Sequence, residues 1–357
     1  MRKILLFLVF TSILNVNAQK CFTGKVEDLK KLTTRPLAVV VMPEEGNETI
    51  EELKKKISKT KKEKKKKKLQ KELDDLIYNI KYFNTTVKEV VPEYWKLNDA
   101  QNITYLTKEE IEKLRKEKST EFAVLNLTPD EVSVSGYNMY YTMSFNLMTY
   151  GKSEKKRTKA TYRNHLVNTN FNYPKTNFKN KNQKKLIEEL EFEKEGKAKV
   201  LSKENIIVTL ILAQNIIEEA LKTGEKISFH KYAENQSDKN KKELVGKKLL
   251  IQSAISGSKL YKQFEKYKDR VELVSAKRIA DAIINKEDVY IGFPLIKKYV
   301  KAKSSFGPVG FVSALTMDHK VVFNPSKGKI ISFRNAPSPL NYRSFKRKDI
   351  EKLFVAE

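Results

Sequence analysis

Two distant segments of the chain repeat the same order of secondary-structure signals, and this repetition constrains the fold more than any other feature. Asn102–Leu127 and Arg270–Leu295 each indicate a strand, a hydroxyl residue, a short helix and a second strand. A shift of 168 residues aligns Ile103 with Val271. Strands that alternate with helices favour a mostly parallel sheet with helices packed on its faces.

The hydroxyl residues of the two segments, Thr107 and Ser275, stand where a helix N-cap belongs. Their side-chain oxygens can accept hydrogen bonds from the backbone N–H groups that the first helical turn leaves without partners. One residue is then lost from the alignment, and Phe122–Val124 matches Val289–Ile291. We therefore predict that the chain contains an internal duplication.

The similarity extends outward from both segments. Arg35–Glu44 and Gly246–Ala254 are apolar runs typical of buried strands, whereas Tyr137–Gly151 and Gly310–Phe323 alternate like half-buried strands. Asn324–Phe333 adds a turn and a further strand, which indicates a hairpin. The predicted fold class is α/β, with two related lobes, each a mostly parallel mixed sheet with flanking helices and a C-terminal antiparallel hairpin.

A connecting region is expected between the lobes. Ile206–Ile217 is apolar nearly all round, which favours a buried helix, and Ser202 and Gly224 are plausible start and stop signals for it. The predicted division is a first lobe at 19–175, a charged linker with a buried helix (203–223) at 176–240, and a second lobe at 241–357.

The first eighteen residues have the pattern of a cleavable secretory signal peptide. Arg2 and Lys3 form a positive start, Ile4–Leu14 is apolar, and Ala18 offers a small residue before the expected cut. The apolar run is shorter than the roughly 20 residues that span a bilayer. We therefore expect export, to the bacterial periplasm or the cell surface.

Cys21 is the only cysteine, so no internal disulfide is possible and a free thiol is expected. Gln19 and Lys20 before it do not fit the small or aliphatic residues of a lipoprotein signal. Because we interpret the chain as bacterial, its N-x-S/T sequences are not expected to carry glycans. They lie at Asn47, Asn84, Asn102, Asn126 and Asn235.

The most basic stretch is an insertion in the first lobe, at about 51–83. Twelve lysines occur from Lys54 to Lys71, while Leu69 and Leu73 begin an apolar series at helical spacing. We expect a solvated helix or helical hairpin that stands off the lobe, with a tip frayed by repulsion between lysines. The candidate polyanion contacts are Lys61, Lys62, Lys64, Lys65, Lys66, Lys67 and Lys68.

The formal net charge of +27 favours anionic partners. Candidates are lipid headgroups, acidic glycans or an anionic protein, whereas export argues against nucleic acid. The alternative is that the lysines reflect only the composition of an AT-rich genome.

Motifs for catalysis are absent from the sequence. His165, His230 and His319 are scattered without metal-ligand spacing, and Asp318 and His319 are expected in an exposed turn. No phosphate-binding glycine motif occurs. The nearest candidate for a small anionic ligand is the helix start after the strand at Gly246–Ala254, with Ser256, Ser258 and Lys259.

These observations predict a non-enzymatic exported envelope or periplasmic protein that binds an anionic surface or a protein partner. No catalytic residue, metal or cofactor is expected. One alternative is a small-molecule binder with a cleft between the two lobes. The further alternative is an exported hydrolase.

Overall fold

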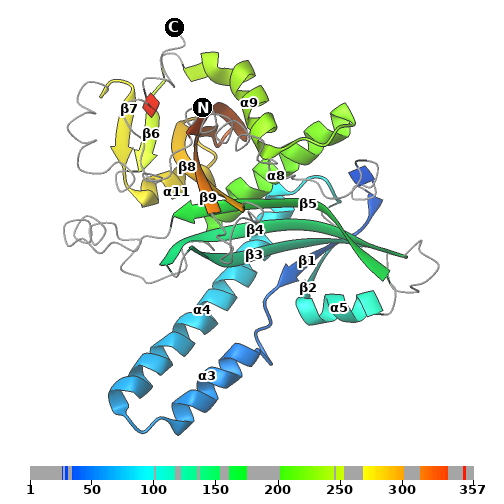
Figure 1. Cartoon of the computed structure of the whole chain (residues 1–357), viewed down its shortest axis with the longest axis vertical. Coiled ribbons are helices and arrows are strands. Elements are labelled where there is room, and N and C mark those ends of the chain that lie inside the picture. The colour runs from blue at the N-terminus through cyan, green and yellow to red at the C-terminus, as the bar shows by residue number, and fades with distance from the viewer. Residues whose placement is uncertain are drawn as a thin grey trace, which may run out of the picture.

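The computed structural model of the chain describes twelve ranges of residues. They are 26, 29–30, 34–99, 102–116, 122–134, 137–152, 161–174, 202–244, 247–252, 268–300, 314–336 and 349–350. The expected signal peptide and Cys21 lie outside them. The described part is an α/β structure, in which helices pack on a mixed sheet (Figure 1).

The first five strands form one unit, here called the first unit. Its strand order is β2-β1-β3-β4-β5; β1, β2 and β3 are parallel, and β4 and β5 are antiparallel to their neighbours. The strands are β1 (Leu37–Val41), β2 (Ile103–Thr107), β3 (Ala123–Val134), β4 (Tyr137–Lys152) and β5 (Thr161–Pro174).

The second unit has the same order and the same strand directions, β7-β6-β8-β9-β10. The two units are joined where β5 pairs with β8, at Asn172 and Ile296. The strands of the second unit are β6 (Leu249–Gln252), β7 (Val271–Val274), β8 (Tyr290–Val300), β9 (Ala314–Asn324) and β10 (Lys329–Ala336).

Strand register is also equivalent in the two units. Leu37, at the start of the central strand β1, is opposite Ile103 of β2, and Leu249, at the start of β6, is opposite Val271 of β7. Ile103 and Val271 are residues that the sequence alignment matches. The third strands agree as well, through the pairs Leu37–Ala123 and Leu249–Tyr290.

Helical segments with defined bounds accompany these strands. They are α3 (Glu48–Lys59), α4 (Glu63–Tyr94), α5 (Lys108–Lys116), α8 (Lys203–Thr223), α9 (Phe229–Asn240), the short η3 (Lys241–Leu244) and α11 (Ala276–Ile284).

The predicted N-caps of α5 and α11 are confirmed. Thr107 Oγ1 accepts from the Glu110 N–H at 3.3 Å, and a Glu110 carboxylate oxygen accepts from the Thr107 N–H at 2.6 Å. This reciprocal pair is a capping box. In the second unit, Ser275 Oγ accepts from the Arg278 N–H at 3.1 Å. The same position therefore starts the corresponding helix in both units.

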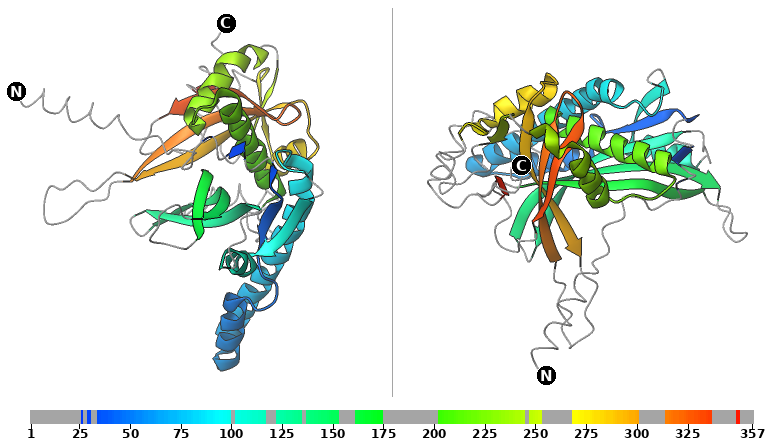
Figure 2. Two further views of the ribbon diagram at one scale, coloured as in Figure 1. Left: turned by 90° about the vertical axis from the view of Figure 1, so that its right-hand side faces the viewer. Right: turned by 90° about the horizontal axis from the view of Figure 1, so that it is seen from above.

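Helix α8 lies at the centre of the main core. Its side chains are buried almost all round, and Gly224 ends it with a φ of 71°, in the left-handed region that glycine adopts without strain. The same buried cluster contains Leu37 and Leu125 of the first unit and Phe323 and Ile330 of the second. Figure 2 shows the two sets of strands on either side of this helix. The two units therefore share one core.

The remaining faces of the two units have separate, smaller clusters. In the first unit, Ile111 of α5 packs with Val40 and Val124 on the face away from the main core. In the second unit, Leu249 and Ile251 belong to a cluster of their own, whereas Ile291 belongs to the main core.

Polar side chains of α9 cover the outer edge of β10. Ser237 Oγ accepts from the Phe333 N–H at 3.0 Å, and Asn240 Nδ2 donates to the Ile330 carbonyl at 2.8 Å. Edge strands carry unpaired backbone groups that invite pairing with another chain, so this cover protects the edge. The predicted C-terminal hairpin is confirmed as β9 and β10.

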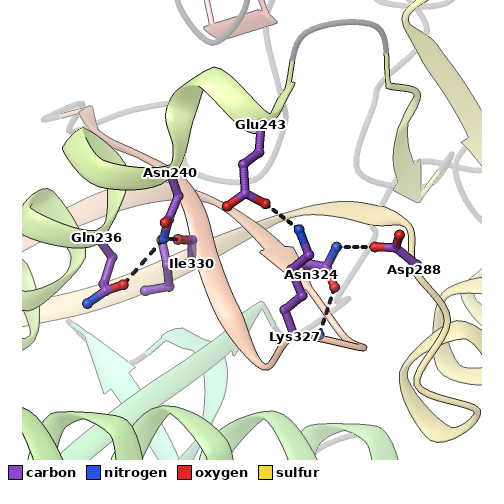
Figure 3. A network of polar contacts seen from close by, with 7 residues as sticks. All are labelled: Gln236, Asn240, Glu243, Asp288, Asn324, Lys327 and Ile330. Carbon is purple, nitrogen blue, oxygen red and sulfur yellow. Dashed lines mark hydrogen bonds and ion pairs between the residues drawn. The ribbon is translucent and has the colours of Figure 1, made fainter.

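The turn between β9 and β10 is fixed by the network in Figure 3. Buried Asn324 accepts from the Lys327 N–H at 2.9 Å and donates to Asp288 at 2.8 Å. The Lys327 ammonium group pairs with Glu243 at 2.6 Å. The hydrogen bond from Asn324 holds the pKa of the Asp288 carboxyl below its usual value.

Pro92 lies inside α4 and cannot donate a backbone hydrogen bond to the carbonyl of Lys88, four residues earlier. The Tyr105 hydroxyl of β2 donates to that carbonyl instead, at 3.3 Å. The proline therefore creates an acceptor that ties α4 to the edge strand of the first unit.

Tyr105→Phe is expected to lower the free energy of unfolding by about 1 kcal/mol, because the Lys88 carbonyl loses its partner. In a Pro92→Ala background the new N–H can bond to that carbonyl, so the same change should cost much less. Urea unfolding of the four proteins measures this coupling. Equal losses in both backgrounds would contradict it.

Candidate functional site

The lysine-rich insertion forms a helical hairpin that projects from the body of the protein (Figure 1). We call residues 48–80, which are α3 and the first half of α4, the arm. An apolar seam holds its helices together, with Ile50 and Leu53 of α3 buried against Leu73 and Ile80 of α4. Partly buried Ile57 and Leu69 extend this seam toward the tip.

The base of the arm is attached to the first unit through Asn84. Its Oδ1 accepts from the Met42 N–H, and its Nδ2 donates to the Met42 carbonyl, each at 2.9 Å. The same amide nitrogen also donates to Glu44 at 2.9 Å. The Asn84 side chain is 3% exposed, so its amide group depends on these bonds, because a buried polar group without a partner is costly. They fix the direction in which the chain leaves β1.

The second half of α4 anchors the arm in the main core. Phe83, Val87, Val90 and Val91 are buried there. From Phe83 to the start of α4 at Glu63 the helix extends about 30 Å. Because one continuous helix joins core and tip, the arm holds its end at a fixed distance from the body.

The tip of the arm carries the seven predicted contact residues, which we call the tip lysines. All seven are exposed. Lower on the arm, Lys54 and Lys56 pair with Glu51 and Glu52 at 2.7 and 3.3 Å, but the tip lysines form no ion pair within the described ranges. They are Lys61, Lys62, Lys64, Lys65, Lys66, Lys67 and Lys68.

The expected fraying of the tip is not observed. Helix α3 continues to Lys59 and α4 begins at Glu63, so only Thr60–Lys62 separate them. The seam through Ile57 and Leu69 accounts for this order, since it continues apolar contact nearly to the end of the hairpin. Lysines in the last turn of α3 also interact favourably with its helix dipole.

The charge at the tip surrounds α4 rather than forming a stripe. Successive residues of a helix are rotated by about 100°, so five consecutive lysines, Lys64–Lys68, cover every side. They also occupy the N-terminal end of α4, where the helix dipole is positive and the first backbone N–H groups have no partner within the helix. Lys62 provides no side-chain cap there. A bound anion would relieve this accumulation of positive charge.

The other predicted ligand loop cannot be placed. Ser256, Ser258 and Lys259 lie outside the described residues. The corresponding loop of the first unit, after β1, leads into the arm, and the backbone of its first residue, Met42, is already bonded to Asn84.

The expectation of an exposed Asp318–His319 turn is wrong. Both residues lie within β9, and His319 is 1% exposed. Its ring lies 5.9 Å from that of His230 and 5.2 Å from that of Phe333. His230 Nε2 also lies 3.1 Å from a carboxylate oxygen of Glu234, which can accept a hydrogen bond from this ring nitrogen. The alternation of β9 could have indicated a buried side for His319.

Sequence spacing could not indicate this histidine pair, because α9 and β9 are brought together only by the fold. No group of three or more His, Cys, Asp or Glu residues in the described ranges is arranged to hold a metal ion. The pair packs against Phe333 and we interpret it as part of the core.

A polar cluster surrounds the N-terminus of α8. The Lys203 N–H donates to the Tyr82 hydroxyl at 3.2 Å, and its ammonium group pairs with Glu89 of α4. Burial raises the pKa of the Glu204 carboxyl, and the negative charge of Asp281 in α11 adds to this shift. This cluster joins α4, α8 and α11.

Glu204→Gln is expected to stabilise the protein near neutral pH. A carboxyl whose pKa is raised by folding stabilises the folded state below its ordinary value of 4.5, and this contribution is lost as the pH rises through the folded pKa. The gain in melting temperature should therefore shrink toward acidic pH. Glu225→Gln, at an exposed position just after α8, is the control. A gain independent of pH would contradict the assignment.

Comparison with known proteins gives no relative: no family model, no curated protein and no solved structure matches the chain. None of the helices in the described ranges has the length and apolar character needed to cross a bilayer.

Proposed function

We propose that this is an exported, non-enzymatic protein that binds an anionic partner through the tip lysines. The observation that carries the proposal is a set of seven exposed lysines with no acidic partner among the described residues, held about 30 Å from the core by one helix. Paired surface lysines would be neutralised locally. These lysines form no such pair among the described residues, and the single carboxylate within residues 61–68, Glu63, leaves most of their charge available to a partner.

We further propose that the two units arose by duplication of one α/β lobe. The equal strand order, the equal register and the shared N-cap position support this. The arm has no counterpart of similar length in the second unit, where only residues 253–270 separate β6 from β7. The binding function would then be a later addition to one copy. Export, to the periplasm or the cell surface, rests on the N-terminal pattern of the sequence.

The junction between the two units does not favour the alternative of a small-molecule cleft. Apolar side chains of α8 occupy it, and Leu210, Leu212 and Ile216 are fully buried there. Binding of an anionic partner at the arm is therefore the better supported of the two proposals.

Replacement of Lys64–Lys68 by glutamine tests the proposal. Binding to heparin, a soluble polyanion, should weaken at least about tenfold, since each lysine near an anionic surface contributes up to roughly 1 kcal/mol. Binding of the unchanged protein should also fall as salt is raised. Fluorescence anisotropy with labelled heparin measures both effects.

The matched control removes the same charge elsewhere. It replaces five exposed lysines of the α8–α9 region, Lys222, Lys226, Lys231, Lys239 and Lys242, by glutamine. If net charge alone attracted the polyanion, both variants would weaken binding equally, and the arm would have no special role.

A further inference from the structure

We propose that the anionic partner is a lipid bilayer with anionic headgroups, and that the arm meets it end-on. This inference rests on the proposed function and names its partner. It is carried by the distribution of charge along the arm.

The two ends of the arm differ in charge. Below the tip, its flank carries exposed carboxylates on both helices. Glu51 and Glu52 of α3 pair with lysines of the same helix, and Asp74 of α4 accepts from Gln70 at 2.9 Å. Exposed lysines lie among these carboxylates, so the net charge of the flank is close to zero, whereas the tip is strongly positive; the flank lysines are Lys54, Lys55, Lys56, Lys59 and Lys71. We call the acidic residues of this stretch the flank carboxylates. They are Glu48, Glu51, Glu52, Glu72, Asp74 and Asp75.

An anionic surface that lay along the side of the arm would meet the flank carboxylates and lysines, whose charges nearly cancel. It would also meet only part of Lys64–Lys68, since these residues point in all directions around α4. An approach from the end avoids both problems. Residues 61–68 extend only about 8 Å along the arm, which is about one Debye length at physiological salt. All the tip lysines then lie within the field of the surface at the same time.

A flat surface fits this geometry better than a long flexible polymer. A polymer that continued past the tip would run along the flank, where the net charge is close to zero, whereas a bilayer perpendicular to the arm meets only the positive tip. The backbone N–H groups at the N-terminus of α4 face the same end, and helix N-termini favour phosphate groups.

The contact with the bilayer would be electrostatic, and no part of the arm would insert among the lipid tails. In the described ranges the exposed large apolar side chain is Tyr78, at 41% exposure, and it lies on the arm behind the tip lysines. Without an apolar group at the tip, binding should be reversible and sensitive to salt. The body would be held about 30 Å from the headgroups, beyond the reach of its own charges.

Co-sedimentation with vesicles tests this inference on the full protein. The vesicles contain either phosphatidylcholine alone or equal parts of phosphatidylcholine and phosphatidylglycerol. Binding is expected only to the anionic vesicles, at least about tenfold weaker for the Lys64–Lys68 glutamine variant, and unchanged for the α8–α9 control.

A third variant, Glu72→Gln with Asp74→Asn and Asp75→Asn, tests the orientation. End-on contact leaves these residues away from the surface, so binding to the vesicles should change little. If the variant bound much more tightly, the flank would lie against the lipid and end-on contact would be excluded.

The outcomes separate this inference from the function on which it rests. Tip-dependent binding to heparin without binding to anionic vesicles would retain the proposed function and overturn the lipid inference. Failure to bind either one would overturn both.

Discussion

Replacing Asp349 with alanine is expected to lower the free energy of unfolding by about 3 to 5 kcal/mol, the usual cost of removing one partner of a buried ion pair. Asp349 pairs with the guanidinium group of Arg334 in β10, and the two side chains are 6% and 22% exposed. Directly opposite Arg334 in the sheet is Lys320 of β9, which is 1% exposed.

Two cations that face each other across neighbouring strands repel. Asp349 supplies the negative charge beside Arg334, and without it the guanidinium group would lose this partner in a site with limited access to water. Arginine cannot give up its proton to escape this, because its pKa is too high.

Denaturant unfolding followed by the fluorescence of Trp95, the single tryptophan and a buried one, measures the loss. Glu243→Ala is the matched control, since it breaks the more exposed pair with Lys327 and should cost less than about 1 kcal/mol. Equal losses for the two variants would show that Asp349 does not compensate a buried charge.

Replacing Ile216 of α8 with alanine is expected to cost about 2 to 5 kcal/mol, because it opens a cavity in the core between the units. Ile216 is fully buried. Because the two units share one core, we expect a second result. Both units should lose stability together, in one unfolding transition.

Hydrogen exchange of the backbone N–H groups in β1 and β6 measures the loss in each unit separately. Leu221→Ala, at a partly buried position near the end of α8, should cost less. If only one of the two strands exchanged faster in the Ile216 variant, the units would be independent domains.

The sequence predicted those elements whose apolar pattern is continuous. Strand β1 is a β-branched run, and Thr107 and Ser275 are local capping signals, so each could be recognised from neighbouring residues. Strand β5 was not predicted. Its residues, TYRNHLVNTNFNYP, are mostly polar, and its pairing with β4 becomes visible only in the sheet.

The arm was predicted as a helical hairpin, but the order of its tip was not. Repulsion between lysines is evident in the sequence, whereas the seam that opposes it depends on the antiparallel contact of α3 with α4. The role of Asn84 was hidden for the same reason, since its partner Met42 lies 42 residues earlier. Of the expected site residues, the tip lysines could be assessed, and Ser256, Ser258 and Lys259 could not.

The position of α8 has a consequence for how the two units can change over time. Val124 and Ile291 occupy the same place in the register of their units. Yet Ile291 packs into the main core, whereas Val124 is covered by α5. The two units are therefore not related by a two-fold axis that would give matching residues the same surroundings. Matching residues have different neighbours. Transplanting a side chain from one unit to its counterpart should therefore be tolerated poorly, and under the proposed duplication the two sequences are expected to diverge.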